Sequence, residues 1–245
     1  MAELSPRDYD ALVEAILAAA EPRARPVSRV ASALESTLLA PDATASQIEQ
    51  VCEEAVTLGL AAVCVAPAWI ALAAERLRST PVLAVTVVGF PLGSTLGSAK
   101  IYEAAECLKL GADELDVVIN LAALKSGHDG RVQGELQTIT AQAHAAGARV
   151  KAILEMGLLS AGELERAADA SLAAGADFLK NATGFGPNGA SPEAIARLRD
   201  LAGGRARIKA AGGIRTAAQA EALLHAGADR LGSSHAASVL GVPTH

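Results

Sequence analysis

The chain has 245 residues, of which 51% are hydrophobic and only 2% aromatic, and its formal net charge is −6. Many α/β barrels of about 250 residues fold as one domain, which predicts a single domain over 1–245. Small and branched apolar side chains suit helices packed on a buried parallel sheet. The acidic balance, the lack of a basic stripe and the scarcity of aromatic platforms argue against a nucleic-acid partner.

Neither a targeting segment nor a membrane span is expected. The N-terminal stretch contains Glu3, Asp8 and Asp10, unlike a signal peptide. Gly, Pro, Ser or Thr interrupt the uncharged stretches 55–74 and 79–99, so we expect buried strands and loops there instead of spanning helices. Three well-separated cysteines predict neither a disulfide framework nor a zinc site. We therefore expect a cytoplasmic protein.

A recurring sequence phrase organises the chain. It reads Leu110-Gly111-Ala112-Asp113, then Ala174-Gly175-Ala176-Asp177, then Ala226-Gly227-Ala228-Asp229. Each copy follows an amphipathic run and precedes a short apolar run. A helix that ends on a left-handed glycine before a strand explains the phrase. Its repetition predicts β/α units and a parallel sheet.

Eight strands are predicted, with helices between them and an extra helix over about 7–20. Ser46, Ser160 and Thr216 begin sequences with capping-box spacing, and Pro192 suits a first helical position. No predicted strand leads into the glycine pattern of dinucleotide-binding folds. Eight such units favour a closed eight-stranded β/α (TIM) barrel. The strands are expected near 33–38, 61–66, 82–88, 115–120, 149–155, 177–181, 206–211 and 229–232.

Two lysines lie on neighbouring predicted strands, and Lys180 comes at the end of its strand, where β/α barrels place their catalytic groups. Lys180 could reach outward to solvent, but an outward side chain would meet a covering helix, so we favour an inward lysine. Lys209 lies at a similar height on the next strand. Two amines in one desolvated pocket lower an amine's pKa, which frees a lone pair to attack a carbonyl. Lys180 is therefore the candidate imine-forming nucleophile.

Further candidates lie on other strands. Asp116 sits in apolar company, where a carboxylate needs a partner; a structural ion pair and a proton relay are compatible roles. Lys151 and Glu155 share strand parity, and the sequence does not decide whether both line the barrel in a charge network. Cys64 falls near the end of the second strand, close to the expected pocket, although its default interpretation is a small buried apolar residue.

Glycine-rich strand ends suggest a phosphate site. Gly212-Gly213 follows the seventh predicted strand, and Gly232-Ser233-Ser234 ends the eighth and opens a last short helix. Loops after these two strands often bind phosphate in barrels, through backbone amides and a helix N-terminus. Gly184 follows Lys180 and is expected to close the same end.

At these residues the chain resembles deoxyribose-phosphate aldolases. The resemblance implies reversible cleavage of 2-deoxy-D-ribose 5-phosphate to acetaldehyde and D-glyceraldehyde 3-phosphate in deoxyribose catabolism, without a metal or an organic cofactor. It implies imine formation by Lys180, a second lysine at Lys209 and proton transfer by Asp116. The segments that carry it run from about residue 34 to 240: Ala62-Val63-Cys64-Val65, Val88-Gly89-Phe90-Pro91-Leu92-Gly93, Ala112-Asp113-Glu114-Leu115-Asp116-Val117-Val118-Ile119-Asn120, Ala123-Leu124-Lys125-Ser126-Gly127, Ala176-Asp177-Phe178-Leu179-Lys180, Thr183-Gly184-Phe185-Gly186, Ala211-Gly212-Gly213-Ile214-Arg215-Thr216 and Gly232-Ser233-Ser234.

Departures from the family pattern keep two rival functions open. The first strand has Glu35, Ser36 and Ala40 where the family often has Asp, His and Lys, and Asn181-Ala182 follows the nucleophile. These changes suit another lysine aldolase, or a phosphate-binding isomerase, with an altered substrate. The second rival is a non-catalytic barrel that binds a sugar phosphate. The expected partners are a small sugar phosphate and further copies of the chain, as a dimer or tetramer.

Overall fold

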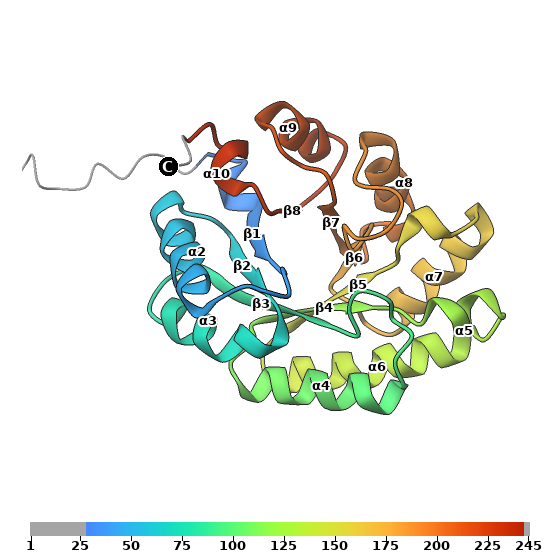
Figure 1. The fold of residues 1–245 in the computed structure, drawn as a ribbon. Helices are drawn as coiled ribbons and strands as arrows, with labels where there is room; N and C mark the ends of the chain where they lie inside the picture. Colours follow the sequence, from blue (N-terminus) through green and yellow to red (C-terminus); the bar gives the residue numbers. More distant parts are fainter. Residues whose placement is uncertain (1–27, 243–245) are drawn as a thin grey trace, which may run out of the picture.

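A closed barrel of eight parallel strands forms the centre of the computed structural model, which describes residues 28–242 (Figure 1). The strands follow one another around the barrel in chain order, and β8 closes it by pairing with β1. All eight predicted strands are confirmed. They are β1 Leu34–Leu38, β2 Ala62–Val65, β3 Leu83–Val88, β4 Glu114–Val118, β5 Arg149–Ile153, β6 Phe178–Lys180, β7 Arg207–Ala211 and β8 Arg230–Ser233.

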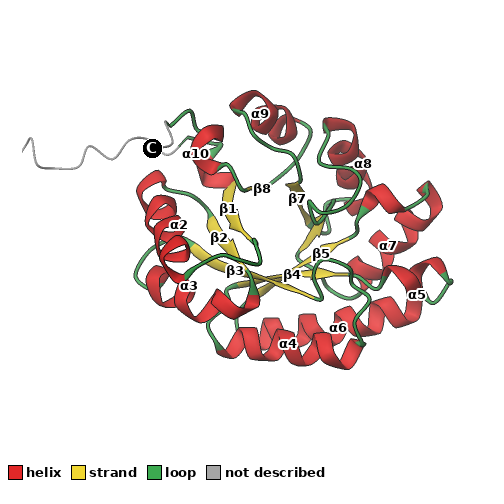
Figure 2. Cartoon of the chain, viewed as in Figure 1, coloured by secondary structure: helices red, strands yellow, loops and turns green. Residues whose placement is uncertain are grey.

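Helices cover the outside of the barrel (Figure 2). None of the helices within 28–242 is long and apolar enough to cross a membrane. The extra helix predicted over 7–20 falls outside the described residues. The α-helices are α2 Ala45–Leu58, α3 Ile70–Leu77, α4 Gly97–Lys109, α5 Leu121–Lys125, α6 Asp129–Ala145, α7 Ala161–Ala173, α8 Pro192–Ala202, α9 Ala217–His225 and α10 Ala236–Val239, and the short 3-10 helices are η1 Ala31–Ala33, η2 Pro67–Trp69 and η3 Met156–Leu158.

The helix ends follow from local side-chain chemistry. Ser160 and Thr216 form the predicted capping boxes of α7 and α9, and Ser191 caps α8 ahead of Pro192. The prediction at Ser46 is wrong: α2 begins two residues earlier, where Thr44 has the extended backbone of an N-cap and forms a capping box with Gln47.

The glycines of the recurring phrase adopt the left-handed conformation that the sequence predicted. The φ angles of Gly111, Gly175 and Gly227 are 98°, 81° and 107°. Because a residue with a Cβ is strained there, glycine lets each helix end and turn into the next strand.

The interior of the barrel divides into an apolar side and a charged side. A small cluster of Ala62, Cys64, Val85 and Val87 fills the part next to β2 and β3. Other inward positions hold buried charged side chains around the ring of Phe178, whereas the larger apolar core lies between the strands and the helices. Buried charges require partners, so this side of the barrel must contain an ion-pair network. Its members are Glu35, Glu114, Asp116, Lys151, Lys180, Lys209 and Arg230.

Candidate active site

Lys180 at the end of β6 and Lys209 in the middle of β7 lie side by side. They are register partners across the two strands, and their side chains are only 4% and 1% exposed. The predicted inward orientation of Lys180 is thus the observed one, since its side-chain nitrogen contacts the carboxylate of Asp116 on β4, two strands away around the barrel.

Asp116 on β4 connects three lysines. Its Oδ2 accepts from Nζ of Lys180 at 2.7 Å and from Nζ of Lys209 at 2.6 Å, and its Oδ1 accepts from Nζ of Lys151 at 2.9 Å. Asp116 is fully buried. One carboxylate therefore fixes the amines of Lys180 and Lys209 at hydrogen-bond distance from a shared oxygen, which allows protons to pass between them.

A second layer of charges holds this group in place. Glu35 pairs with Lys209 and with Arg230, the latter at 3.2 Å. Glu114 lies 2.5 Å from Nζ of Lys151 and 3.4 Å from Arg230. Glu35, Glu114 and Asp116 thus each contact at least two cations, which offsets the cost of burying their charges.

The charge balance of the barrel favours one neutral amine. Three carboxylates face four buried cations if every group is ionised, and Arg149, with its side chain 34% exposed, contacts Glu114 at the edge. Lys180 is the amine expected to be neutral. Among the described residues it contacts only one carboxylate, that of Asp116, whereas Lys151 and Lys209 each contact more than one.

The pKa shifts of Lys180 and Lys209 have opposite signs. Burial lowers the pKa of Lys180, and the charge of Lys209 adds to this effect against the opposing pull of Asp116. Burial also disfavours the charged form of Lys209, but Asp116 and Glu35 together raise its pKa above the ordinary value of 10.5. Lys180 is thus suited to be a nucleophile and Lys209 to remain an ammonium group.

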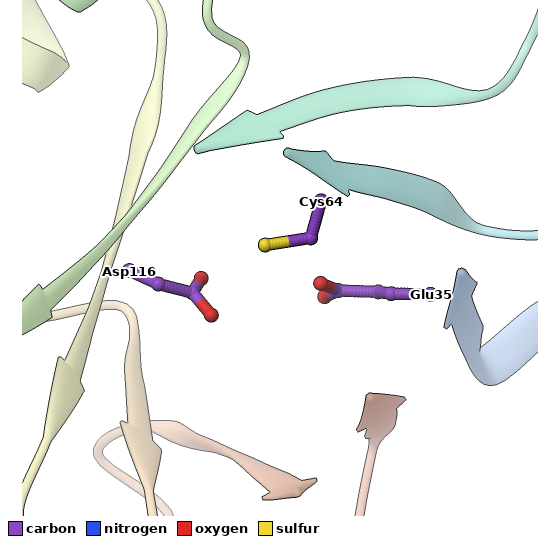
Figure 3. A group of neighbouring side chains, drawn as sticks. All are labelled: Glu35, Cys64 and Asp116. Carbon is purple, nitrogen blue, oxygen red and sulfur yellow. The ribbon is translucent and has the colours of Figure 1, made fainter. Parts of the chain in front are cut away.

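Cys64 on β2 points into the same space as Glu35 and Asp116 (Figure 3). One possible ligand atom from each of these three residues lies within 4.8 Å of the others. However, the ammonium group of Lys209 bonds to both carboxylates and so takes the place of a bridging cation. Burial raises the pKa of the Cys64 thiol to about 11, which keeps it protonated and a poor metal ligand near neutral pH. The donor set fits an ammonium group better than a metal ion.

A cavity of about 520 Å³ gives access to the two lysines. The six residues predicted to bind phosphate all line it, namely Gly184, Gly212, Gly213, Gly232, Ser233 and Ser234. Arg215 and His235 line it as well and were not among the predicted site residues. The cavity therefore joins a reactive amine to glycine-rich loops with two basic side chains nearby, which suits a small phosphorylated carbonyl compound.

Glycine is required where the loops after β6 and β7 meet. Gly212 has φ +98°, and a Cβ there would lie 2.9 Å from Cα of Gly189. The amide of Ala190 donates to the carbonyl of Gly212 at 2.9 Å. A side chain at position 212 would separate the two loops and open the cavity wall.

Lys151 and Glu155 have different environments. Lys151 joins the network of buried charges, but the carboxylate of Glu155 bonds to Thr183 instead. Regular strand geometry ends at Ile153, and the backbone turns left-handed at Glu155, so strand parity no longer applies. Glu114 and Arg230 were missed, although Glu114 has the same parity as Asp116.

The fold and the site define a class of protein: a β/α-barrel enzyme with a buried amine suited to attack carbonyl groups. The family model described as DeoC/LacD family aldolase matches residues 30–238, and the chain belongs to this family. Family membership and the buried amine make the protein a lyase of the aldolase type.

The related proteins agree with this assignment. The deoxyribose-phosphate aldolase of Geobacillus sp. (strain WCH70) is 42% identical over 213 residues, covering 87% of this chain and 95% of the relative. That of Caldanaerobacter subterraneus subsp. tengcongensis is 44% identical over 206 residues, covering 84% and 89%. A solved tetrameric deoxyribose phosphate aldolase from Aeropyrum pernix superposes with a TM-score of 0.82 at 36% identity, covering 87% and 91% of the two chains.

Proposed function

We propose that the protein is a deoxyribose-phosphate aldolase that reversibly cleaves 2-deoxy-D-ribose 5-phosphate to acetaldehyde and D-glyceraldehyde 3-phosphate. The observation that carries the proposal is the buried Lys180 amine, which bonds to Asp116 beside Lys209 and lines a cavity with phosphate-binding features. The names and high coverage of the relatives support the choice of substrate.

The neutral amine of Lys180 begins the reaction by attacking C1 of the open-chain sugar. Loss of water gives an iminium ion, which accepts the electron pair of the C2–C3 bond when that bond breaks. Loss of the C3 hydroxyl proton releases D-glyceraldehyde 3-phosphate and leaves an enamine on Lys180. Protonation of the enamine carbon and hydrolysis of the resulting imine release acetaldehyde and restore the amine.

Asp116 and Lys209 supply the proton transfers in this proposal. The Asp116 carboxylate accepts hydrogen bonds from both lysines, so it can take a proton from the reacting centre, directly or through water. The Lys209 ammonium stabilises negative charge and returns a proton. Glu35 keeps Lys209 charged, which gives the first-strand glutamate a function compatible with the same reaction.

The phosphate is proposed to lie at the far end of the cavity from Lys180. Amides of the loops after β7 and β8 are suited to bind its oxygens, and Arg215 and His235 supply basic side chains. Ser233 is partly engaged already, since its hydroxyl donates to the carbonyl of Ile214. Its backbone amide and Ser234 are the better candidates for direct contact.

Incubation with 2-deoxy-D-ribose 5-phosphate should release equal amounts of acetaldehyde and D-glyceraldehyde 3-phosphate. A panel of other phosphorylated sugars and aldehyde donors tests the rival function, a lysine aldolase with another substrate. Ala40 motivates this test, because it lines the cavity where the family often has a lysine. Turnover of another sugar phosphate without cleavage of the deoxyribose compound would refute the substrate assignment. Binding without any turnover would support the non-catalytic barrel.

Lys209→Met should lower turnover and shift the reaction of Lys180 to higher pH. Lys209 disfavours a second positive charge beside it, so its removal raises the pKa of Lys180. Loss of this acid should reduce the rate by about a hundredfold or more. The pH dependence of kcat/KM and of borohydride trapping with acetaldehyde measures both effects. The exposed Lys125→Met serves as the control, and an unchanged pH profile in Lys209→Met would count against the coupling of the two amines.

Several expectations remain proposals. We propose that copies of the chain associate, as the Aeropyrum pernix aldolase does in its tetramer. A single-domain organisation is also proposed from the chain length, and a role in deoxyribose catabolism from the proposed substrate. A cytoplasmic location is proposed because all three cysteines are free thiols. Action without a metal or organic cofactor follows from the proposed lysine chemistry.

A further inference from the structure

Glu155 has an unusual backbone conformation at the catalytic end of the barrel. It is the one non-glycine residue of 28–242 with a positive φ, at 50°. It follows β5 and precedes η3. A residue with a Cβ is disfavoured in this conformation, and such strain is often found where a side chain must be held in a functional position.

The side chain of Glu155 is buried and bonds to the loop that follows β6. Its Oε2 accepts from the amide of Thr183 at 3.1 Å and from the Thr183 hydroxyl. That hydroxyl in turn accepts from the amide of Phe185 at 3.0 Å. The neighbouring amide of Met156 donates to the carbonyl of Asn181 at 2.9 Å. The segment after β5 therefore fixes the first turn of this loop.

This loop, residues 181–190, forms one wall of the substrate cavity. Thr183, Gly184 and Phe185 line the same cavity as Lys180. The far end of the loop contacts the phosphate-site glycines, through the hydrogen bond from Ala190 to Gly212. A displacement of Thr183 would therefore alter the wall between the amine and the proposed phosphate site.

The second carboxylate oxygen of Glu155, Oε1, occupies the space that a side chain at Gly186 would need. Oε1 is buried and has no hydrogen-bond partner among the described residues. A Cβ at Gly186 would collide with it, although the backbone of Gly186 is not in the left-handed region. The carboxylate and the loop are thus packed so closely that a single methyl group at Gly186 must displace one of them.

We propose that Glu155 is a positioning residue that holds the loop 181–190 in place and so determines how tightly the phosphorylated end of the substrate binds. That this substrate is a sugar phosphate rests on the proposed function. Glu155 makes no ion pair with Lys151, Lys180 or Lys209 within the described structure. Its removal should therefore impair binding of the sugar phosphate and leave imine formation with acetaldehyde nearly unchanged.

Glu155→Gly tests the proposal without adding strain, since glycine accepts the left-handed backbone. We expect KM for 2-deoxy-D-ribose 5-phosphate to rise about tenfold or more, the effect of losing hydrogen bonds to a charged group. kcat and the rate of borohydride trapping with acetaldehyde should stay within about threefold. Glu155→Gln keeps an acceptor for Thr183 and should restore most of the affinity.

Gly186→Ala provides an independent test, because it moves the carboxylate without deleting it. It should raise KM in the same direction as Glu155→Gly. Gly134→Ala, at an exposed position of α6 with no atom within 4 Å of the added carbon, is the matched control and should leave KM unchanged. An unaltered KM in both Glu155→Gly and Gly186→Ala would overturn the proposal, as would an equal loss of kcat and trapping with KM constant.

A titration with inorganic phosphate separates this proposal from the proposed function. If wild type fails to cleave deoxyribose 5-phosphate, the substrate assignment fails. The concentration of phosphate that half-maximally raises Tm still reports on the site. A weaker response in Glu155→Gly than in Glu155→Gln would support the positioning role, and equal responses would refute it.

Discussion

Lys180→Ala should abolish cleavage of 2-deoxy-D-ribose 5-phosphate, lowering kcat/KM by at least about a thousandfold, because the proposed mechanism forms the imine on Lys180. The fold should survive the change. Asp116 keeps its hydrogen bonds to Lys151 and Lys209, and removal of an amine that is neutral in the folded protein leaves the charge balance of the barrel unchanged. The unfolding temperature should therefore stay near that of wild type.

Borohydride reduction with acetaldehyde, followed by peptide mass analysis, identifies the reacting amine directly. Wild type should carry the adduct on Lys180, and Lys180→Ala should carry none. Lys100 is the internal control, since it is equally buried but its Nζ donates to the Val118 carbonyl and pairs with Glu135. An adduct on Lys100 or Lys209, or activity within tenfold of wild type in Lys180→Ala, would contradict the nucleophilic role.

The strand and helix pattern was predictable because its signals are local. The phrase that ends in Ala-Gly-Ala-Asp combines a helix end, a left-handed glycine and the first residues of a strand, and it recurs through the chain. A repeated β/α unit leaves few topologies open. Helix starts were less certain, because Thr44 and Ser46 both have the side chain of an N-cap and only the backbone geometry selects Thr44.

The neighbouring lysines were also predictable, since they lie at similar heights on successive strands. Lys180 and Lys209 are separated by one β/α unit, and parallel pairing places them side by side. The partners of Lys209 and Arg230 were not predictable in this way. Glu35 is 174 residues from Lys209 and 195 residues from Arg230, and these contacts exist only because β8 pairs with β1.

The environment of Glu155 could not be read from periodicity either. Its parity places it with Lys151, but the backbone leaves the strand before it and redirects the carboxylate to Thr183. A single left-handed residue leaves no hydrophobic pattern in the sequence. The sequence was therefore enough to select the candidate amine, whereas the folded chain was needed to find the groups that surround it.

Asp116→Asn should abolish turnover and destabilise the barrel together. Burial alone would raise the pKa of the Asp116 carboxyl, but the charges of Lys151, Lys180 and Lys209 hold it well below its ordinary value of 3.8. The uncharged amide leaves these cations without their shared counter-ion. Removal of one partner from a buried ion pair costs about 3–5 kcal/mol, which denaturant unfolding of the variant should show.

The sign of the pH effect follows from the lowered pKa. A carboxyl group whose folded-state pKa lies below its unfolded value stabilises the fold above the unfolded value and loses that contribution as the pH falls through the folded-state pKa. Wild type should therefore lose stability below about pH 4, and Asp116→Asn should lack this part of the acid transition. Glu165→Gln is the control, because its ion pair with Arg197 is half exposed and contributes less than about 1 kcal/mol.

The double variant Asp116→Asn/Lys151→Met separates stability from catalysis. Loss of Lys151 removes one excess positive charge, while Glu114 keeps Arg149 at 2.8 Å and Glu35 keeps Lys209. The double variant should therefore be more stable than Asp116→Asn and still inactive, since the acceptor between Lys180 and Lys209 is missing. Recovery of activity together with stability would show that Asp116 acts only through the fold and would remove it from the proton-transfer steps.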